Sequence, residues 1–315
     1  MVRPVPGSLK TSSVGVHPAA GWSVSPWRRT NGLMTTAATV GSRSGTPTAA
    51  PSLGTMPTTE PRHRSGPQVI PRPPVHRPGE PAPWSHLVPA ERATVPLAAV
   101  VDAVAAQDRS GDAAAAAAGV SEFSRTFADA FPDADPAAVL VALFEEAGEA
   151  RVLLTVRSTR LRAHQGEVAF PGGKLDDGEG IDEGARREAE EEVGLDPSLV
   201  TVVGHLTAMP TVSSNTLMTP VVAVLSGRPT TSPAPDEVAR VFDVALAELL
   251  ADGVFAEELW AVPGRNGTDG RPGGEFPVWF FSVAGETVWG ATARVLTELL
   301  CLVLGLPGPV PPHRR

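Results

Sequence analysis

The chain has 315 residues and a formal net charge of −9, which is divided unevenly along the sequence. Residues 1–85 carry nine Lys or Arg against two acids, whereas the remaining 230 residues carry a net charge of −16. This distribution excludes a uniformly basic nucleic-acid binder, because the part with a foldable composition is acidic. The single cysteine, Cys301, excludes a disulfide scaffold and a cysteine-rich zinc site.

Residues 1–85 hold 15 of the 33 prolines and show neither helical nor strand periodicity. We therefore expect a disordered, Pro/Arg-rich N-terminal tail. A targeting peptide, a nucleic-acid arm and a proline-rich ligand are functional interpretations of this composition, and a true start at Met34 or Met56 is a simpler one. We favour a tail without a function of its own, so no nucleic-acid partner is expected.

Residues 86–135 are predicted to form a helical N-terminal extension. Val95–Gln107 has apolar residues at helical spacing, and a Gly/Ala linker separates it from a second helix over Ser121–Phe131. In that second helix Phe123, Phe127 and Phe131 are four residues apart and share one face.

From residue 136 to 305 the pattern changes to that of a mixed α and β domain. Ala138–Phe144 and Arg151–Arg157 are β-rich runs around a short turn and predict a hairpin. Trp260–Glu275 is rich in glycine and predicts a loop, and a disordered C-terminal tail is expected over 306–315. The other expected elements are strands at Val200–Leu206, Pro220–Leu225 and Phe276–Val283, a helix at Ile181–Val193 and a last helix at Ala291–Leu304.

Neither a membrane span nor a secretory signal is expected. The longest apolar stretch, Leu299–Leu306, is too short to cross a bilayer. The first 30 residues lack the apolar core of a signal peptide. We therefore expect a cytoplasmic protein without a membrane partner, and a homodimer stays open as its oligomeric state.

The segment Gly173–Leu195 carries nine acids and three bases. On the expected helix, Glu188, Glu191 and Glu192 share one face, where their like charges repel one another. Such a face is either a solvated acidic surface or a set of hard oxygen ligands for Mg²⁺ or Mn²⁺. The opposite face carries small apolar residues that suit packing on a sheet, and Gly194 suits the end of the helix.

The full spacing of this segment favours the metal site. Gly173 is followed after five residues by Glu179, after seven more by Arg187-Glu188-Ala189, and then by Glu191-Glu192, Gly194 and Leu195. This pattern resembles the signature of the Nudix hydrolases. Upstream, the run from Leu153 through Arg157-Ser158, Arg162 and Gly166 to Phe170-Pro171-Gly172-Gly173 is similar to the signature of the coenzyme A pyrophosphatase branch. Val288–Arg294 resembles the segment that opens the last helix of that branch.

The resemblance implies an α+β fold, a Nudix α/β/α sandwich around a mixed β-sheet. It implies metal-dependent hydrolysis of the pyrophosphate bond of coenzyme A or its thioesters to 3′,5′-ADP and (acyl-)4′-phosphopantetheine. It also assigns Glu188 and Glu192 as metal ligands and Glu191 as a further ligand or the water-activating base. Arg187 is expected to pair with Glu179 and orient the cluster, and the backbone of Gly172 and Gly173 to approach the metal or substrate.

Arg157, Arg162 and His164 are the expected substrate-binding residues, because a 3′-phosphate needs positive charge beyond that of the metal. Arg160 lies in the same run, and each of these side chains alone also reads as an ordinary surface residue. Two other functions stay open: a Nudix enzyme for ADP-ribose or NADH, and a catalytically inactive Nudix module that senses a ligand. The intact set of glutamates argues against the inactive module.

Overall fold

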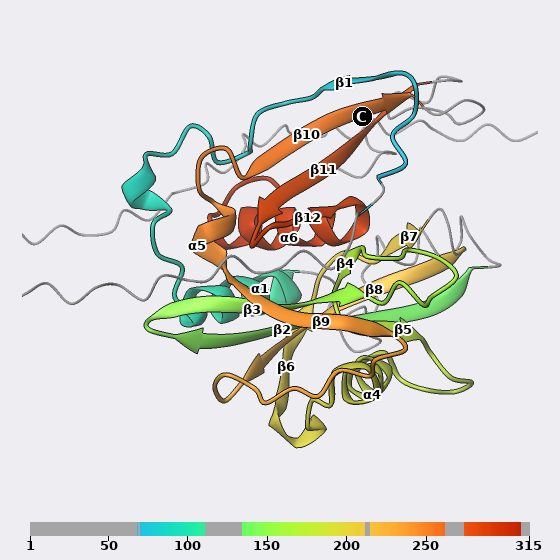
Figure 1. Ribbon diagram of the computed structural model, residues 1–315. Coiled ribbons are helices and arrows are strands. Elements are labelled where there is room, and N and C mark those ends of the chain that lie inside the picture. Colours follow the sequence, from blue (N-terminus) through green and yellow to red (C-terminus); the bar gives the residue numbers. More distant parts are fainter. Residues whose placement is uncertain (1–67, 69, 111–133, 212–214, 262–273, 310–315) are drawn as a thin grey trace, which may run out of the picture. The chain divides into compact units, whose positions relative to one another are not determined.

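The computed structural model describes residues 68, 70–110, 134–211, 215–261 and 274–309, all of which belong to the compact unit Pro57–Arg315 (Figure 1). The expected helix Ser121–Phe131 lies outside these residues, as do nearly all of residues 1–69 and the final residues 310–315.

A mixed sheet forms the centre of the fold. The expected hairpin is confirmed: β2 (Asp135–Glu146) and β3 (Glu149–Arg157) are antiparallel, and Ala147 and Gly148 turn the chain with φ of 55° and 80°. β8 (Thr216–Leu225) pairs parallel with β2, which makes the sheet mixed. β6 (Val200–His205) pairs antiparallel with β8, and β9 (Val238–Ala245) pairs antiparallel with β3.

Two short strands separate β2 from β3 beyond their shared turn. β2 and β3 pair only over Leu143–Glu146 and Glu149–Val152. Farther along, β4 (Val168–Ala169) pairs with β3 and β5 (Gly172–Lys174) pairs with β2. Because β9 occupies the other edge of β3, the β4–β5 segment lies between β2 and β3. The short strand β7 (Met209–Thr211) pairs with the start of β8.

The helix α4 (Ile181–Val193) covers one face of this sheet and has the expected bounds. Its small residues Ala185 and Ala189 are fully buried and pack in one cluster with Ala138 and Ala142 of β2. Small side chains on both sides allow the helix to approach the strands closely. The helix ends at Gly194, which adopts the left-handed conformation with φ of 65°.

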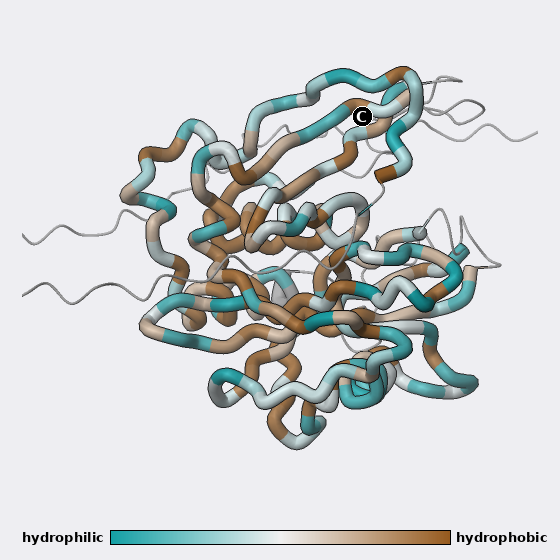
Figure 2. The backbone as a smooth tube through the Cα atoms, viewed as in Figure 1, coloured by the Kyte–Doolittle hydropathy of each residue, from teal (hydrophilic) through white to brown (hydrophobic). Residues whose placement is uncertain are grey.

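The opposite face of the sheet is covered by α1 (Leu97–Ser110) and α6 (Gly290–Val303). Alternate residues of β2 (Val139, Val141 and Leu143) point into this second core, so both faces of the strand are buried. The expected α+β fold, an α/β/α sandwich around a mixed sheet, is confirmed (Figure 1). Figure 2 shows α6 as largely hydrophobic and α4 as largely hydrophilic.

A second, four-stranded sheet packs on α6. Its order is β1 (His76–Pro78), β10 (Phe255–Ala261), β11 (Glu275–Val283) and β12 (Glu286–Trp289), and all its pairings are antiparallel. The one-turn helix α5 (Leu246–Leu249) and the 3₁₀ turns η1 (Pro89–Glu91) and η2 (Pro197–Leu199) complete the elements of the described residues.

Three sequence-based expectations need correction. The disordered tail over residues 1–85 is wrong for residues 70–85, because β1 pairs with β10 and Trp84 is buried in the core. The helix expected at Val95–Gln107 is present as α1 but runs over Leu97–Ser110, and η1 is the other helical segment in the described part of the extension 86–135. The expected loop Trp260–Glu275 has strand residues at both ends, since β10 continues to Ala261 and β11 begins at Glu275.

Candidate functional site

Gly172 and Gly173 bring the backbone of β5 unusually close to its neighbours. A Cβ atom on Gly173 would lie 2.5 Å from Oε1 of Glu188. A Cβ atom on Gly172 would lie 2.4 Å from the carbonyl oxygen of Ala138. Glycine at 173 therefore lets α4 place the Glu188 carboxylate against β5, and glycine at 172 lets β5 approach β2 closely.

Glu192 is the buried carboxylate of the site, with 4% of its surface exposed. Its Oε2 accepts a hydrogen bond of 3.2 Å from the Gly172 N–H, and its Oε1 lies 3.7 Å from Nη1 of Arg157. Burial raises the pKa of Glu192 to about 7, against the opposing effects of the Gly172 hydrogen bond and the Arg157 charge. The fold therefore holds this carboxylate with less compensating charge than its ionised form requires.

Arg187 joins three other carboxylates of the motif. Its Nε and Nη2 donate to the two oxygens of Glu179 at 2.8 and 3.0 Å. Its Nη1 lies 3.0 Å from Oε1 of Glu188 and 3.0 Å from Oε2 of Glu191. Nη2 also donates to the carbonyl oxygen of Lys174 at 3.0 Å. The expected pair of Arg187 with Glu179 is present, and its hydrogen bonds hold the pKa of Glu179 below the usual value.

Glu188 and Glu191 differ in their surroundings. Burial raises the pKa of Glu188 although Arg187 opposes the shift. The Glu191 side chain is 59% exposed. The structure thus provides one buried, one half-buried and one exposed carboxylate at the three positions expected to bind a metal.

Glu237 belongs to the same electrostatic environment and was not predicted. Its negative charge contributes to the raised pKa of both Glu188 and Glu192. It lies just before β9, and its carbonyl oxygen accepts a hydrogen bond of 2.8 Å from the N–H of Ser158. The signal that could have found it is the β3–β9 pairing, which brings this segment beside Arg157.

The residues expected to bind substrate have different surroundings. Arg157 faces Glu192, and its Nε is buried without a hydrogen-bond partner in the described part of the chain. Arg160 pairs with Asp236 at 2.7 Å, and Nδ1 of His164 lies 3.0 Å from Oε2 of Glu167. Arg162 is exposed in the same loop. The structure therefore brings Arg157 to the glutamates, whereas Arg160 and His164 have carboxylate partners of their own.

The donors at this site suit a hard divalent cation. Within the described residues, no three His, Cys, Asp or Glu side chains are already arranged as a metal cluster. Arg187 holds Glu188 and Glu191 on its own guanidinium. The raised pKa values of Glu188 and Glu192 show that burial disfavours their ionised forms, which a bound cation would stabilise. Carboxylate oxygens beside a glycine backbone are ligands of the kind that Mg²⁺ and Mn²⁺ prefer.

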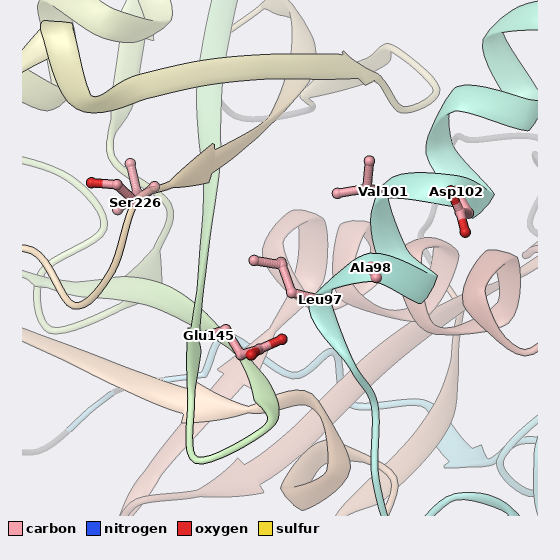
Figure 3. Close-up of a pocket in the computed structure, with 7 residues that line it drawn as sticks. Leu97, Ala98, Val101, Asp102, Glu145 and Ser226 are labelled. Carbon is pink, nitrogen blue, oxygen red and sulfur yellow. The ribbon is translucent and has the colours of Figure 1, made fainter.

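A separate pocket of about 380 Å³ lies at the other end of β2 (Figure 3). The side chains of Leu97 and Val101 from α1 line it together with Asp102 and Glu145. Glu145 stands at the turn end of β2, whereas Gly172 and Gly173 pair with the opposite part of that strand. Because the pocket and the two glycines lie at opposite ends of β2, this pocket is separate from the site around Glu192.

Comparison with known proteins identifies a family and several relatives. Residues 134–261 match the NUDIX domain family. The chain is 40% identical over 181 residues to "Nudix hydrolase 22, chloroplastic" from Arabidopsis thaliana, covering 54% of this chain and 56% of the relative. It is 48% identical over 122 residues to "Nudix hydrolase 15, mitochondrial" from the same plant, covering 37% and 42%. The chain thus spans about half the length of these two plant relatives.

A bacterial relative is covered more completely. The chain is 38% identical over 150 residues to the "Uncharacterized Nudix hydrolase NudL" of Escherichia coli O7:K1, covering 47% of this chain and 72% of the relative. Among solved structures, the Nudix hydrolase RenU from M. Smegmatis matches with 24% identity and a TM-score of 0.30, over 37% of this chain and 73% of that chain. On the family match and the bacterial relative, the chain belongs to the Nudix hydrolase family.

Proposed function

We propose that the protein hydrolyses the pyrophosphate bond of coenzyme A or its thioesters, giving 3′,5′-ADP and (acyl-)4′-phosphopantetheine, with Mg²⁺ or Mn²⁺ as cofactor. The observation that carries this proposal is the arrangement around β5. Glu192 is buried against Gly172, while Arg187 gathers Glu179, Glu188 and Glu191. A divalent cation would compensate the negative charge of this set of carboxylates.

Glu188 and Glu192 are the proposed metal ligands, and Glu191 is a third ligand or the base that activates water. A divalent cation held there neutralises pyrophosphate oxygens and acidifies bound water. Arg187 positions the carboxylates, because its planar guanidinium donates to Glu179 at two points and reaches Glu188 and Glu191 with its third nitrogen. The exposed Glu191 is best placed to exchange a proton with water.

Arg157 is the proposed contact for the phosphates next to the metal ligands. It already lies beside Glu192, and its buried Nε has no acceptor within the described ranges. Arg162 and His164 are proposed to bind the substrate from the adjoining loop, together with the backbone of Gly172 and Gly173. For His164 this requires exchange of its contact with Glu167.

The choice of coenzyme A rests on the upstream segment that ends at Phe170-Pro171-Gly172-Gly173. Its resemblance to the coenzyme A pyrophosphatase signature is the observation that favours this substrate over ADP-ribose or NADH. A cytoplasmic location is part of the same proposal. Within the described residues, no helix is both long and apolar enough to cross a membrane.

Product identification tests the proposal. The full chain is incubated with CoA and Mn²⁺, and in parallel with ADP-ribose and NADH, and the products are identified by mass spectrometry. We expect 3′,5′-ADP and 4′-phosphopantetheine from CoA. Turnover of another substrate without cleavage of CoA would contradict the substrate, and no turnover at all would favour a ligand-sensing module.

Three matched variants of α4 test the site. Glu188→Gln and Glu192→Gln should each lower kcat by about 100-fold or more, since each removes a charge that the metal needs. Glu190→Gln changes an exposed glutamate of the same helix and should keep the wild-type rate. Near-full turnover of Glu188→Gln or Glu192→Gln at saturating metal would show that the ligand assignment is wrong.

A further inference from the structure

Arg294 is a mostly buried cation that the site described above does not use. It lies in α6, and its Nη1 is 3.3 Å from the sulfur of Met209 in β7. Its Nε is buried and has no hydrogen-bond partner among the residues that the structure describes. A thioether sulfur is a weak acceptor, so Nε has lost water without gaining an oxygen acceptor among the described residues in return.

No carboxylate compensates this charge at close range within the described residues. Glu298, one turn farther along α6, acts on Arg294 electrostatically but forms no ion pair with it. Its Oε1 instead accepts the Thr207 N–H at 2.8 Å. By contrast, the buried Arg92 donates to the Leu250 carbonyl and pairs with Asp252 at 2.6 Å. An unpaired buried charge is costly, and such a group in a native fold calls for an explanation.

Arg294 lies at the end of the sheet that carries the Nudix motif. Met209 pairs with Met218, Met218 with Ala137, and Ala137 with Lys174, the residue after Gly173. These four residues stand side by side on β7, β8, β2 and β5, so three strand spacings of ~4.8 Å separate Met209 from the motif. That distance of ~14 Å is comparable to the length of a nucleotide.

The start of α6 spans the same end of the sheet. The Thr292 hydroxyl donates to the carbonyl oxygen of Val168 in β4, and β4 leads directly into Gly172. A long side chain in a helix points back towards the N-terminus of that helix. The Arg294 guanidinium therefore extends towards the first turn of α6, where the helix dipole adds positive potential.

We propose that Arg294 binds a phosphate monoester on the nucleotide part of the substrate, apart from the pyrophosphate bond that is cut. This assignment rests on the proposed function, whose substrate carries such a group at the 3′ position. The planar guanidinium offers several donors in a fixed geometry that matches phosphate oxygens. The bound phosphate supplies the acceptor that Nε lacks among the described residues, and a negative charge at closer range than that of Glu298.

Equilibrium binding of two products to the metal-free full chain tests this role without relying on catalysis. The probes are 3′,5′-ADP, which carries the extra monoester, and 5′-AMP, which lacks it. By calorimetry the wild type should bind 3′,5′-ADP about tenfold or more tightly than 5′-AMP. Arg294→Met should lose this preference while keeping its affinity for 5′-AMP, and Arg294→Lys should retain part of it.

Thermal stability separates a binding role from a structural one. Methionine is unbranched, apolar and close in length to arginine, so Arg294→Met removes the uncompensated charge while filling the space. Its melting temperature should equal or exceed that of the wild type. Arg92→Met, which breaks a fully paired buried arginine, should lower the melting temperature and leave the ligand preference unchanged.

A wild type without preference for 3′,5′-ADP, or a preference that survives in Arg294→Met, would overturn the role of Arg294. If Arg294→Met does not fold, Arg294→Lys decides the question. A reduced or lost preference for 3′,5′-ADP supports the role of Arg294, and a preference retained in full contradicts it. The proposed function can fail independently of this role. If CoA is not cleaved but the protein still prefers 3′,5′-ADP and loses this preference in Arg294→Met, the proposed reaction is wrong and the binding role of Arg294 stands.

Discussion

At the scale of single residues, Arg187 is the group that holds three carboxylates of the motif in position. One guanidinium contacts Glu179, Glu188 and Glu191 and also donates to the Lys174 carbonyl. Lysine would keep the charge but lose the planar set of donors. We therefore expect Arg187→Lys to lower kcat and the affinity for Mn²⁺ by about 10- to 100-fold. Steady-state kinetics and a metal titration would check this, and an unchanged affinity for Mn²⁺ would contradict it.

The environment of Asp243 in β9 makes the free energy of unfolding depend on pH. Burial alone would raise the pKa of Asp243, but hydrogen bonds from Arg228 and Arg151 outweigh it and hold the pKa below the usual value. The unfolded chain therefore binds the proton more readily than the fold. The resulting stabilisation is fully present above about pH 4 and is lost as the pH falls through the lower, folded-state pKa.

Asp243→Asn should therefore cost about 2–4 kcal/mol of unfolding free energy at pH 7, because it removes the buried negative charge that Arg151 and Arg228 share and leaves them the more exposed Glu146 and Glu248. The difference from the wild type should shrink as the pH falls below about 4. Urea unfolding of both proteins from pH 7 to pH 2 measures this. Glu275→Gln, which alters an ion pair on the surface, is the control and should cost less than about 1 kcal/mol. A constant difference down to pH 2 would show that Asp243 does not titrate as described.

At the scale of elements, the two glycines of β5 should respond differently to the same added methyl group. The methyl of Gly172→Ala meets the backbone of Ala138 and Val139, which cannot move without breaking the β2–β5 pairing. The methyl of Gly173→Ala meets the end of the Glu188 side chain, which can rotate away. Gly172→Ala should therefore lose stability, whereas Gly173→Ala should fold and lose metal affinity.

Thermal unfolding and a Mn²⁺ titration of both variants would separate these effects. Gly178→Ala is a useful control, because a Cβ atom there meets nothing and only its φ of 82° opposes the change. That variant should lose about 1 kcal/mol of stability and keep its metal affinity. Equal losses of stability in Gly172→Ala and Gly173→Ala would contradict the distinction between backbone and side-chain contacts.

Elements with strong local signals were predictable from the sequence. The acidic helix has the bounds Ile181–Val193 that its apolar spacing and Gly194 indicated, and the β2–β3 hairpin follows from two apolar runs around a turn. The strands β4 and β5 were not predictable, since they hold two and three residues and exist through pairing with β3 and β2. Pairing between distant segments leaves no periodicity in such short runs.

The residues of the site also fall into two groups, those that the sequence predicts and those whose positions depend on contacts between distant segments. The motif spacing predicted the pair of Arg187 with Glu179 and put Arg187, Glu188 and Glu192 on one helix, and both features are present. The roles of these residues stay a prediction. Glu237 was missed because only the register of β9 against β3 brings it near the motif. The partners of Arg160 and His164 are Asp236 and Glu167, and such pairs depend on loop geometry that composition does not encode.

At the scale of the whole molecule, residues 70–85 show how a polar, proline-rich segment can still belong to a folded core. Arg72 pairs with Glu258 at 2.9 Å and lies over the ring of Phe280, while β1 forms the edge of the second sheet. Composition predicts disorder because few of these residues are apolar. The partners that order the segment lie about 180 residues farther along the chain, beyond the reach of any local pattern.

Trp84 should be the residue through which this segment stabilises the fold. It is 1% exposed, with ring centroids 5.3 Å from Phe255 and 6.2 Å from Phe281. Trp84→Ala should cost about 3–5 kcal/mol of unfolding free energy through lost burial and a cavity. Val88→Ala, at a side chain that is 58% exposed, should change it by less than about 0.5 kcal/mol.

Two shortened chains extend the test from one side chain to the segment. A chain that begins at Val69 keeps β1, Arg72 and Trp84, whereas a chain that begins at Ser85 loses all three. Urea unfolding should show the second chain destabilised by at least as much as Trp84→Ala, because the edge of the second sheet and the aromatic contacts are lost together. Equal midpoints for the two chains would mean that residues 70–84 lie on the fold without stabilising it.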